Sequence, residues 1–231
     1  MLLIVSSNEK YVSNILEKIT YKEKEITPNM SKVYECNYND HKFMILATGY
    51  GKVNIGSSLR YVVDKYNITV ILCIGTAGSI SDSNKIFNAI IPISTMQFDV
   101  DFTPNGYSAM QIPLLDNYEY KTNEDINNLL IEICNLYCNY SVDSIASSDM
   151  FVSNYRLSNS IRLECNAGVV DTESGSVGEF SYINNIPYSC IKIISNYANN
   201  NAIKQYKSYN NESNDMCQKI VYEFIKKFYD E

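Results

Sequence analysis

Two acidic residues stand one position apart at the end of an apolar run, in the segment 168–173 (GVVDTE). An ionised carboxylate accepts hydrogen bonds and donates none, so Asp171 or Glu173 would suit a pair of sugar hydroxyls. In open α/β sheets ligands bind at the carboxyl ends of strands, which is where this segment would place both acids. Taken alone, however, the segment is more typical of a helix start, with Asp171 or Thr172 as the cap and Glu173 in the first turn.

Polar or glycine-rich segments follow the other expected strands as well. They cover residues 6–9, 48–51, 75–79, 147–152 and 195–196. In a largely parallel sheet these strand ends converge on one cleft, which would offer acids, amides, hydroxyls and aromatic faces. Phe151 is placed to stack on a flat heterocycle, although packing in the core explains a lone phenylalanine equally well. Gly75 and Gly78 would let a ligand approach the backbone closely, but any tight turn has the same need.

Several kinds of chemistry have little support in the sequence. The only histidine, His41, lies in a polar turn, which argues against a histidine-based triad or a zinc site. The seven cysteines are odd in number and contain no CxxC pair, so we expect reduced thiols in a cytoplasm. Neither GxxxxGK[ST] nor GxGxxG is present. We therefore expect no metal and no cofactor.

Composition indicates one domain with a sizeable core. The chain has 231 residues, of which 45% are hydrophobic and 19% charged, and we expect a single α/β domain over residues 1–231. A formal net charge of −7 argues against a nucleic-acid partner. No apolar run reaches the roughly 18 residues of a membrane span. Residues 1–6 lack a basic flank and predict a first strand instead of a signal peptide.

Strands and helices alternate along the chain. Apolar runs predict strands at 2–5, 32–36, 42–47, 69–74, 86–93, 142–146, 168–171 and 189–195. Helical spacing of apolar residues predicts helices at 9–19, 53–63, 123–137, 154–165, 174–184 and 212–229. Residues 75–79 are expected to form a glycine turn, and the polar stretch 197–210 a mobile loop. This order predicts a mixed, twisted central sheet with helices on both sides.

In order and spacing these segments resemble the nucleoside phosphorylase superfamily, in particular its methylthioadenosine/S-adenosylhomocysteine nucleosidases. The carriers are 49–54 (GYGKVN), 75–78 (GTAG), 99–101 (DVD) with 106–107 (GY), 148–152 (SDMFV), 171–173 (DTE) and 194–196 (ISN). The resemblance spans nearly the whole chain. It implies a three-layer fold, cleavage of the N-glycosidic bond of a purine nucleoside, no cofactor and a homodimer.

The resemblance also implies roles for single residues. Glu173 would hold the ribose 2′- and 3′-hydroxyls, with Asp171 in a supporting role. Thr172, where the family usually has methionine, would pack under the sugar. Phe151 would stack on the purine, and the backbone of Val152 would contact the purine edge.

Other site residues follow from the remaining motifs. Thr76 would face the sugar or the nucleophile, and its motif brings Ala77 and Gly78 to the site, as the last motif brings Ser195. Tyr107 matches a position that lines the pocket for the 5′-substituent, often across a dimer interface.

The two positions that carry acid–base chemistry in the resembled family differ in this sequence. Asn196 replaces an aspartate; its amide can hydrogen-bond to purine N7 or to a 6-oxo group but cannot deliver a proton. The water-aligning glutamate falls near Tyr11, and Glu9 is the nearest carboxylate. General acid–base catalysis is typically worth about 10²–10⁴-fold.

Three functions therefore remain open. They are a nucleosidase with altered machinery or substrate, a 6-oxopurine nucleoside phosphorylase or hydrolase, and a purine-binding relative without turnover. Against phosphorolysis, no arginine precedes the glycines of 75–78, and no other arginine stands out as a phosphate clamp.

Overall fold

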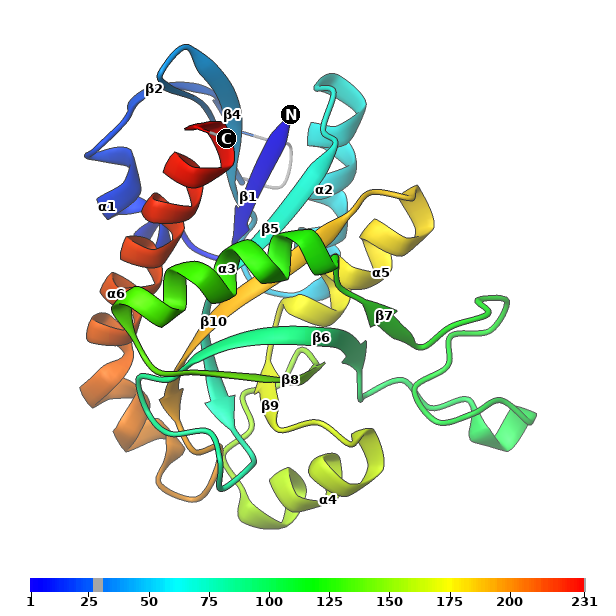
Figure 1. Cartoon of the computed structure of the whole chain (residues 1–231). Helices are drawn as coiled ribbons and strands as arrows, with labels where there is room; N and C mark the ends of the chain where they lie inside the picture. The colour runs from blue at the N-terminus through cyan, green and yellow to red at the C-terminus, as the bar shows by residue number, and fades with distance from the viewer. Residues whose placement is uncertain (27–30, 231) are drawn as a thin grey trace.

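The computed structural model describes residues 1–26 and 31–230, and ten strands in that part of the chain form one mixed sheet (Figure 1). The strands are β1 (Leu2–Ser6), β2 (Thr20–Ile26), β3 (Lys32–Tyr38), β4 (His41–Ala47), β5 (Val70–Ser79), β6 (Ala89–Gln97), β7 (Glu119–Lys121), β8 (Tyr140–Ser147), β9 (Val169–Asp171) and β10 (Tyr188–Asn196). The helices are α1 (Ser13–Leu16), α2 (Lys52–Lys65), α3 (Glu124–Tyr137), α4 (Tyr155–Cys165), α5 (Ser174–Asn184) and α6 (Ala202–Asp230), with 3-10 turns η1 (Glu9–Tyr11) and η2 (Thr103–Asn105).

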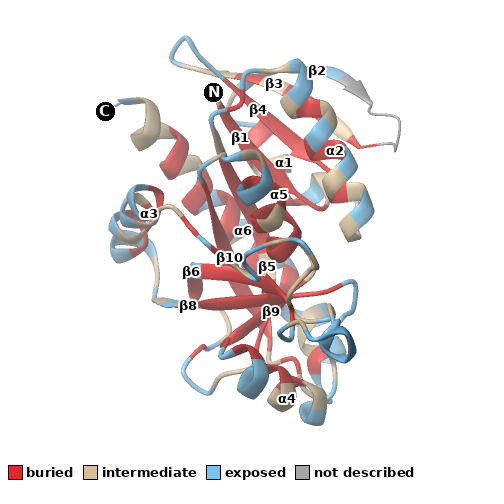
Figure 2. Cartoon of the chain, turned by 90° about the vertical axis from the view of Figure 1, so that its right-hand side faces the viewer, coloured by how far each residue is buried: buried red, intermediate tan, exposed pale blue. Residues whose placement is uncertain are grey.

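Part of the sheet closes on itself. Strands follow the order β10-β6-β8-β9-β5-β1-β4-β3-β2, and a further pairing of β10 with β5 joins the first five into a ring. Strands β1 and β10 run parallel to β5, whereas β9 runs antiparallel to it. Closure leaves these five strands without a free edge, and Figure 2 shows them buried along most of their length. The predicted mixed central sheet is confirmed; the ring was not predicted.

Helices cover both faces of the sheet and bury apolar side chains against it. Side chains of α1, α3 and α6 share one cluster of buried residues with β1, β4, β6 and β10. Side chains of α2 and α5 pack on the other face. Helix α4 closes the end where β8 and β9 finish, through Ile161 and Cys165. The expected three-layer α/β domain is thereby confirmed.

Three local predictions were wrong. The helix expected over 9–19 is divided into η1 and α1 and ends at Leu16, because the chain then turns into β2. Residues 75–79 are not a turn: they continue β5, since β10 and β9 pair with them on its two sides. Strands β2 and β7 were not predicted.

The third wrong prediction was the mobile loop at 197–210. Helix α6 begins at Ala202, ten residues earlier than expected. Residues 203–209 are exposed or half-buried, but Asn210 is buried and accepts the hydroxyls of Thr76 at 2.7 Å and Tyr11 at 3.4 Å. Farther along α6, Gln218 accepts from the backbone N–H of Asn14 at 2.7 Å, and Asn214 donates to the Lys10 carbonyl at 3.0 Å. Internal hydrogen bonds therefore hold α6 against the rest of the chain. Among the described residues, no helix is both long and apolar enough to cross a bilayer.

Candidate active site

The ends of β5, β9 and β10 open into a cavity of about 200 Å³. Strand register brings its parts together, since Gly78 pairs with Asn196 on one side and with Val170 on the other. A side chain at Gly78 would not fit, because its Cβ would lie 2.9 Å from Asn196 Oδ1. The cavity is lined by Tyr11, Tyr50, Thr76, Ala77, Gly78, Met150, Phe151, Val152, Val170, Asp171, Thr172, Glu173, Ser195, Asn196 and Tyr206. All the predicted site residues except Glu9 and Tyr107 are among them.

Glu173 and Asp171 share one buried cation that the sequence reasoning missed. Lys192 Nζ lies 2.9 Å from Glu173 Oε2 and 3.0 Å from Asp171 Oδ2, and the lysine side chain is 0% exposed. Burial alone would lower the pKa of Lys192, but the surrounding Cys73, Glu173 and Asp171 raise it well above its usual range. The ammonium is therefore held charged. The available signal was the lysine itself, alone in the apolar run of β10 (YSCIKIISN).

Asp171 has a supporting role in this geometry. Its carboxylate accepts the backbone N–H of Ser174 at 3.2 Å and the hydroxyls of Ser147 and Ser174 at 2.5 Å, which fixes the start of α5. Burial raises the pKa of Asp171, but Lys192 and the two hydroxyls outweigh it, so that the pKa lies below its usual value. Asp171 is thus both a helix cap and a partner of Lys192.

Glu173 is the acid that faces the cavity. Its residue is 7% exposed, and the Thr172 hydroxyl donates to its Oε1 at 2.9 Å. With Oε2 on Lys192 and Oε1 beside a hydroxyl, the carboxylate has a fixed orientation. Two carboxylates around one ammonium leave one excess negative charge at this wall, which favours bound hydroxyl donors and any positive charge that develops nearby.

Asn196 lines the cavity with a side-chain amide of fixed orientation. Its Oδ1 accepts the backbone N–H of Ala198 at 2.9 Å, which fixes the amide orientation because that N–H can only donate. Its Nδ2 donates one hydrogen to Ser195 Oγ at 3.2 Å and retains a second. A carboxylic acid at this position would have a proton to transfer, whereas this amide can only share a hydrogen bond.

Aromatic rings form the open wall of the cavity. Phe151 is 46% exposed and meets the Tyr206 ring edge-on, with centroids 5.5 Å apart and an interplanar angle of 76°. An exposed phenyl face in a cavity suits a flat heterocycle better than a place in the core. Residue Tyr206 was missed by the sequence reasoning, because the segment that carries it was assigned to a loop.

The glutamate candidate of the first helix lies elsewhere. Glu9 forms an ion pair with Lys32 at 2.7 Å and accepts a hydrogen bond from Tyr34, and both contacts lower its pKa. Tyr11 takes the place in the cavity wall instead and is 5% exposed. The structure therefore does not bring Glu9 into the cavity, because η1 turns that side chain outward toward β3.

Tyr107 also lies apart from the cavity. It follows η2 on the long connection 98–118 between β6 and β7, which extends from the body of the chain (Figure 1). Among the described residues, no group of histidine, cysteine and acidic side chains is arranged to hold a metal ion. The cavity thus offers hydrogen bonds, one net negative charge and aromatic faces.

The ring of strands, its flanking helices and the cavity at the strand ends define a three-layer α/β protein with a candidate site at the strand ends. A family model described as the phosphorylase superfamily matches residues 2–228. The chain belongs to this superfamily, as its motifs predicted.

Known relatives agree with this assignment. The 5′-methylthioadenosine/S-adenosylhomocysteine nucleosidase of Buchnera aphidicola is 31% identical over 208 residues, which cover 89% of this chain and 87% of the relative. Among solved structures, an aspartate-to-asparagine variant of Helicobacter pylori MTAN with 5′-methylthioadenosine in its active site has a TM-score of 0.92 at 20% identity, over 98% of both chains. The Helicobacter pylori futalosine hydrolase also has a TM-score of 0.92, at 22% identity, over 98% of this chain and 97% of its own. At these identities the two structures show a shared fold.

Proposed function

We propose that this chain cleaves the N-glycosidic bond of a purine nucleoside by hydrolysis. The observation that carries the proposal is the joining, in one cavity, of a fixed carboxylate (Glu173), an exposed aromatic face (Phe151) and an amide donor (Asn196). The names of the relatives support it: two are nucleosidases of methylthioadenosine, and futalosine hydrolase is a hydrolase.

The geometry suggests how the chain's residues would act. Phe151 stacks on the base, and Glu173 accepts both ribose hydroxyls while Lys192 holds its other lone pairs in place. As the bond breaks, positive charge grows on the ribose, and the excess negative charge of the Lys192 cluster stabilises it. Asn196 donates a hydrogen bond to N7 of the departing purine and so stabilises its growing negative charge without transferring a proton. Water bonds to C1′ as the bond to the purine nitrogen breaks; the water loses a proton to solvent, and the purine takes one up from solvent.

A 6-oxopurine nucleoside is a second candidate substrate, favoured by the orientation of Asn196. Asn196 lines the cavity, its oxygen accepts from Ala198, and its nitrogen has one hydrogen left after donating to Ser195, so the side chain has a donor to offer a ligand. A 6-oxopurine presents two acceptors, N7 and O6, whereas a 6-aminopurine presents N7 and a donating amino group. Recognition through this donor therefore favours the hypoxanthine or guanine base.

One assay separates these possibilities. The purified chain is incubated with methylthioadenosine, adenosine, inosine and guanosine, each with and without phosphate, and free base is measured by chromatography. Release of base in water supports the proposal, and the preferred base identifies the substrate class. Strict dependence on phosphate would contradict hydrolysis. Calorimetric binding with no base released over hours would identify a purine-binding protein without turnover.

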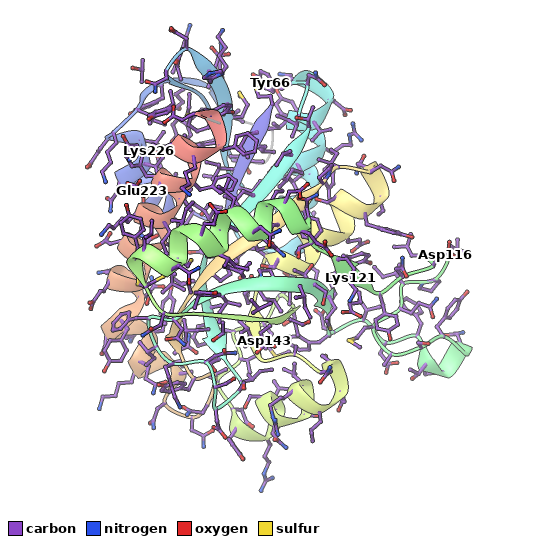
Figure 3. The ribbon with its side chains drawn as sticks, in the orientation of Figure 1. Tyr66, Asp116, Lys121, Asp143, Glu223 and Lys226 are labelled. Carbon is purple, nitrogen blue, oxygen red and sulfur yellow. The ribbon has the colours of Figure 1, made fainter. Side chains whose placement is uncertain are left out.

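We further propose that the chain forms a homodimer through the connection 98–118. This segment extends from the body and carries exposed apolar side chains, with Phe102 42% and Leu114 93% exposed. Figure 3 shows Asp116 on this segment, away from the sheet. Exposed apolar side chains on a projecting segment suit contact with a second copy of the chain. The same segment would carry Tyr107 toward that second copy. Light scattering should give twice the mass of one chain, and a Leu114→Asp variant should dissociate. A monomeric wild type at micromolar concentration would refute the dimer.

We also propose a cytoplasmic location. All seven cysteines lie in the described part of the chain and are free thiols. Six of them are buried, as expected of structural thiols in a reducing compartment.

A further inference from the structure

The loop that carries Phe151 is tied to a distant helix by the side chain of Asp149. This loop, residues 148–154, joins β8 to α4. Asp149 Oδ1 accepts the backbone N–H of Lys52, the first residue of α2, at 2.9 Å and across 97 positions of sequence. Asp149 does not line the cavity, but it stands two residues before Phe151, so the bond acts close to the ring.

Helix α2 needs a cap from elsewhere. The first N–H groups of a helix have no partner within it, and the side chain of the N-cap residue usually satisfies one of them. Here the N-cap residue is Gly51, which has no side chain and a φ of 94°, in the region that favours glycine. The Asp149 carboxylate takes the place of that missing cap, and the helix dipole favours its charge there.

The start of α2 is a firm support for the loop. The apolar side of the helix is buried in the core, and Asn54 Nδ2 donates to the Tyr50 carbonyl at 2.7 Å, which fixes the turn before the helix. The Lys52 ammonium forms an ion pair with Asp99. The backbone N–H of Lys52, and not its charge, therefore holds Asp149.

The other hydrogen bonds of the loop lie at its two ends. Ser148 donates its N–H to the Asp171 carbonyl at 3.3 Å, and its hydroxyl accepts the Met150 N–H at 3.1 Å. At the far end, Asn154 caps α4. The bond from Asp149 adds a tie to α2, on the side of the loop that precedes the half-exposed Phe151 ring.

We propose that Asp149 is a positioning residue for the base: by capping α2 it fixes the loop 148–154, and with it the place of the Phe151 ring over a bound purine. Ordering the ring before the ligand arrives removes that cost from binding. The inference rests on the proposed function, in which Phe151 stacks on the base. It assigns a role in base binding to a residue that does not touch the ligand.

The first test compares bases with nucleosides. Calorimetry measures the affinity for hypoxanthine, inosine, adenine and adenosine in the wild type, in Asp149→Ala and in Asp149→Asn. We expect Asp149→Ala to weaken base and nucleoside by the same factor, roughly three- to tenfold, because part of the stacking is lost. Asp149→Asn keeps the accepting oxygen and should bind within about twofold of the wild type, since the two residues cap helices equally well.

The second test removes the same bond from the other side. Proline is favoured at the first position of a helix and has no N–H, so Lys52→Pro removes the donor without opposing the helix. Lys52→Met is its matched control, because it loses the ammonium and keeps the N–H. Only Lys52→Pro should weaken purine binding, and combining it with Asp149→Ala should add little, because both changes remove one bond.

A cap lost elsewhere separates positioning from stability. Asn123 caps α3 through the Ile126 N–H at 3.0 Å, away from the cavity. Asn123→Ala should lower the free energy of unfolding about as much as Asp149→Ala does, because each change removes one helix cap, yet leave purine affinity unchanged.

Three results would overturn the role of Asp149 and leave the proposed function standing. They are unchanged purine affinity in both Asp149→Ala and Lys52→Pro, a loss confined to nucleosides, and a loss in Asp149→Asn as large as in Asp149→Ala. If Asp149→Ala does not fold, Lys52→Pro and Lys52→Met carry the comparison. A wild type that binds neither purines nor their nucleosides would instead contradict the proposed function itself.

Discussion

Individual side chains in the cavity have fixed, complementary hydrogen-bonding roles. Glu173 accepts hydrogen bonds and Asn196 donates one. The orientation of each side chain is fixed by a neighbour that can only donate: the Lys192 ammonium for Glu173 and the Ala198 N–H for Asn196. This division explains how a cavity with a fixed carboxylate at one wall and an amide at another would orient a nucleoside. The role of each of these two residues can be tested by a substitution that keeps the size of the side chain.

A Glu173→Gln variant should lose nucleoside binding selectively. The amide keeps the size of the side chain, but it replaces a charged acceptor by a neutral one, and hydrogen bonds to charged groups contribute roughly 1.5–3 kcal/mol. We expect nucleoside affinity to fall by one to two orders of magnitude and the affinity for the free purine to change little. Titration calorimetry with inosine and hypoxanthine measures both. Equal losses for the two ligands would remove Glu173 from the ribose.

An Asn196→Asp variant tests the proton donor. If Asn196 stands where an acid would protonate N7, the carboxyl should raise the turnover of 6-aminopurine nucleosides, by up to the roughly 10²–10⁴-fold that general acid–base catalysis supplies. The rate on adenosine and on methylthioadenosine is measured against that of the wild type. An unchanged rate, with the fold intact by circular dichroism, would refute this placement.

At the scale of elements, α5 must begin close against the sheet to deliver Glu173. Gly175 permits this approach: its N–H donates to Ser147 Oγ at 2.7 Å, and an added Cβ would lie 2.5 Å from the Met96 carbonyl oxygen. Because that oxygen belongs to β6, the neighbour cannot move aside without moving the strand. The absence of a side chain at Gly175 is therefore a condition for the site.

Gly175→Ala should accordingly destabilise the fold, whereas a second helical glycine should tolerate the change. Overpacking against backbone typically costs about 1–3 kcal/mol in the free energy of unfolding. Gly56, in α2, has no atom within 4 Å of its added Cβ, so that Gly56→Ala should stabilise by roughly 0.5–1 kcal/mol through helix propensity. Urea denaturation at one protein concentration compares the two variants. A neutral Gly175→Ala would show that α5 can shift without cost.

For the whole molecule, the buried Lys192 cluster makes stability depend on pH. The pKa of Asp171 is lowered in the folded chain, so its contribution is present above the unfolded value of about 3.9 and is lost as the pH falls through the folded value. The pKa of Lys192 is raised, so its contribution persists until the pH rises toward that folded value. Between these limits the ion cluster favours the folded state.

A Lys192→Met variant should reverse the way the free energy of unfolding changes with pH on the acid side of neutrality. It leaves two carboxylates buried without their cation, at a cost of roughly 3–5 kcal/mol near neutral pH. Burial and mutual repulsion then raise the carboxyl pKa values, so the variant should become less stable as the pH rises from 4 to 7, where the wild type becomes more stable or stays level. Urea unfolding at several pH values gives both slopes. Parallel slopes would contradict the assigned ion cluster.

The sequence by itself determined the alternation of elements and most residues of the cavity. Apolar runs and helical spacing located most strands and helices. An element buried on one face has apolar residues at regular spacing, and a strand buried on both faces has a continuous apolar run. Short motifs placed Phe151, Glu173 and Asn196 at strand ends, and the strand ends meet in the structure as expected.

Tertiary structure decided what local patterns could not encode. The closing of the ring depends on pairing between β10 and β5, more than a hundred positions apart, and that pairing turned an expected glycine turn into strand. Contacts with distant residues hold the start of α6, where Asn210 accepts from Thr76 and Tyr11, and they place Lys192 inside beside Asp171 and Glu173. Only the fold brought Tyr11, Tyr50 and Tyr206 into one cavity, because they come from segments far apart in the sequence that meet only when the chain is packed.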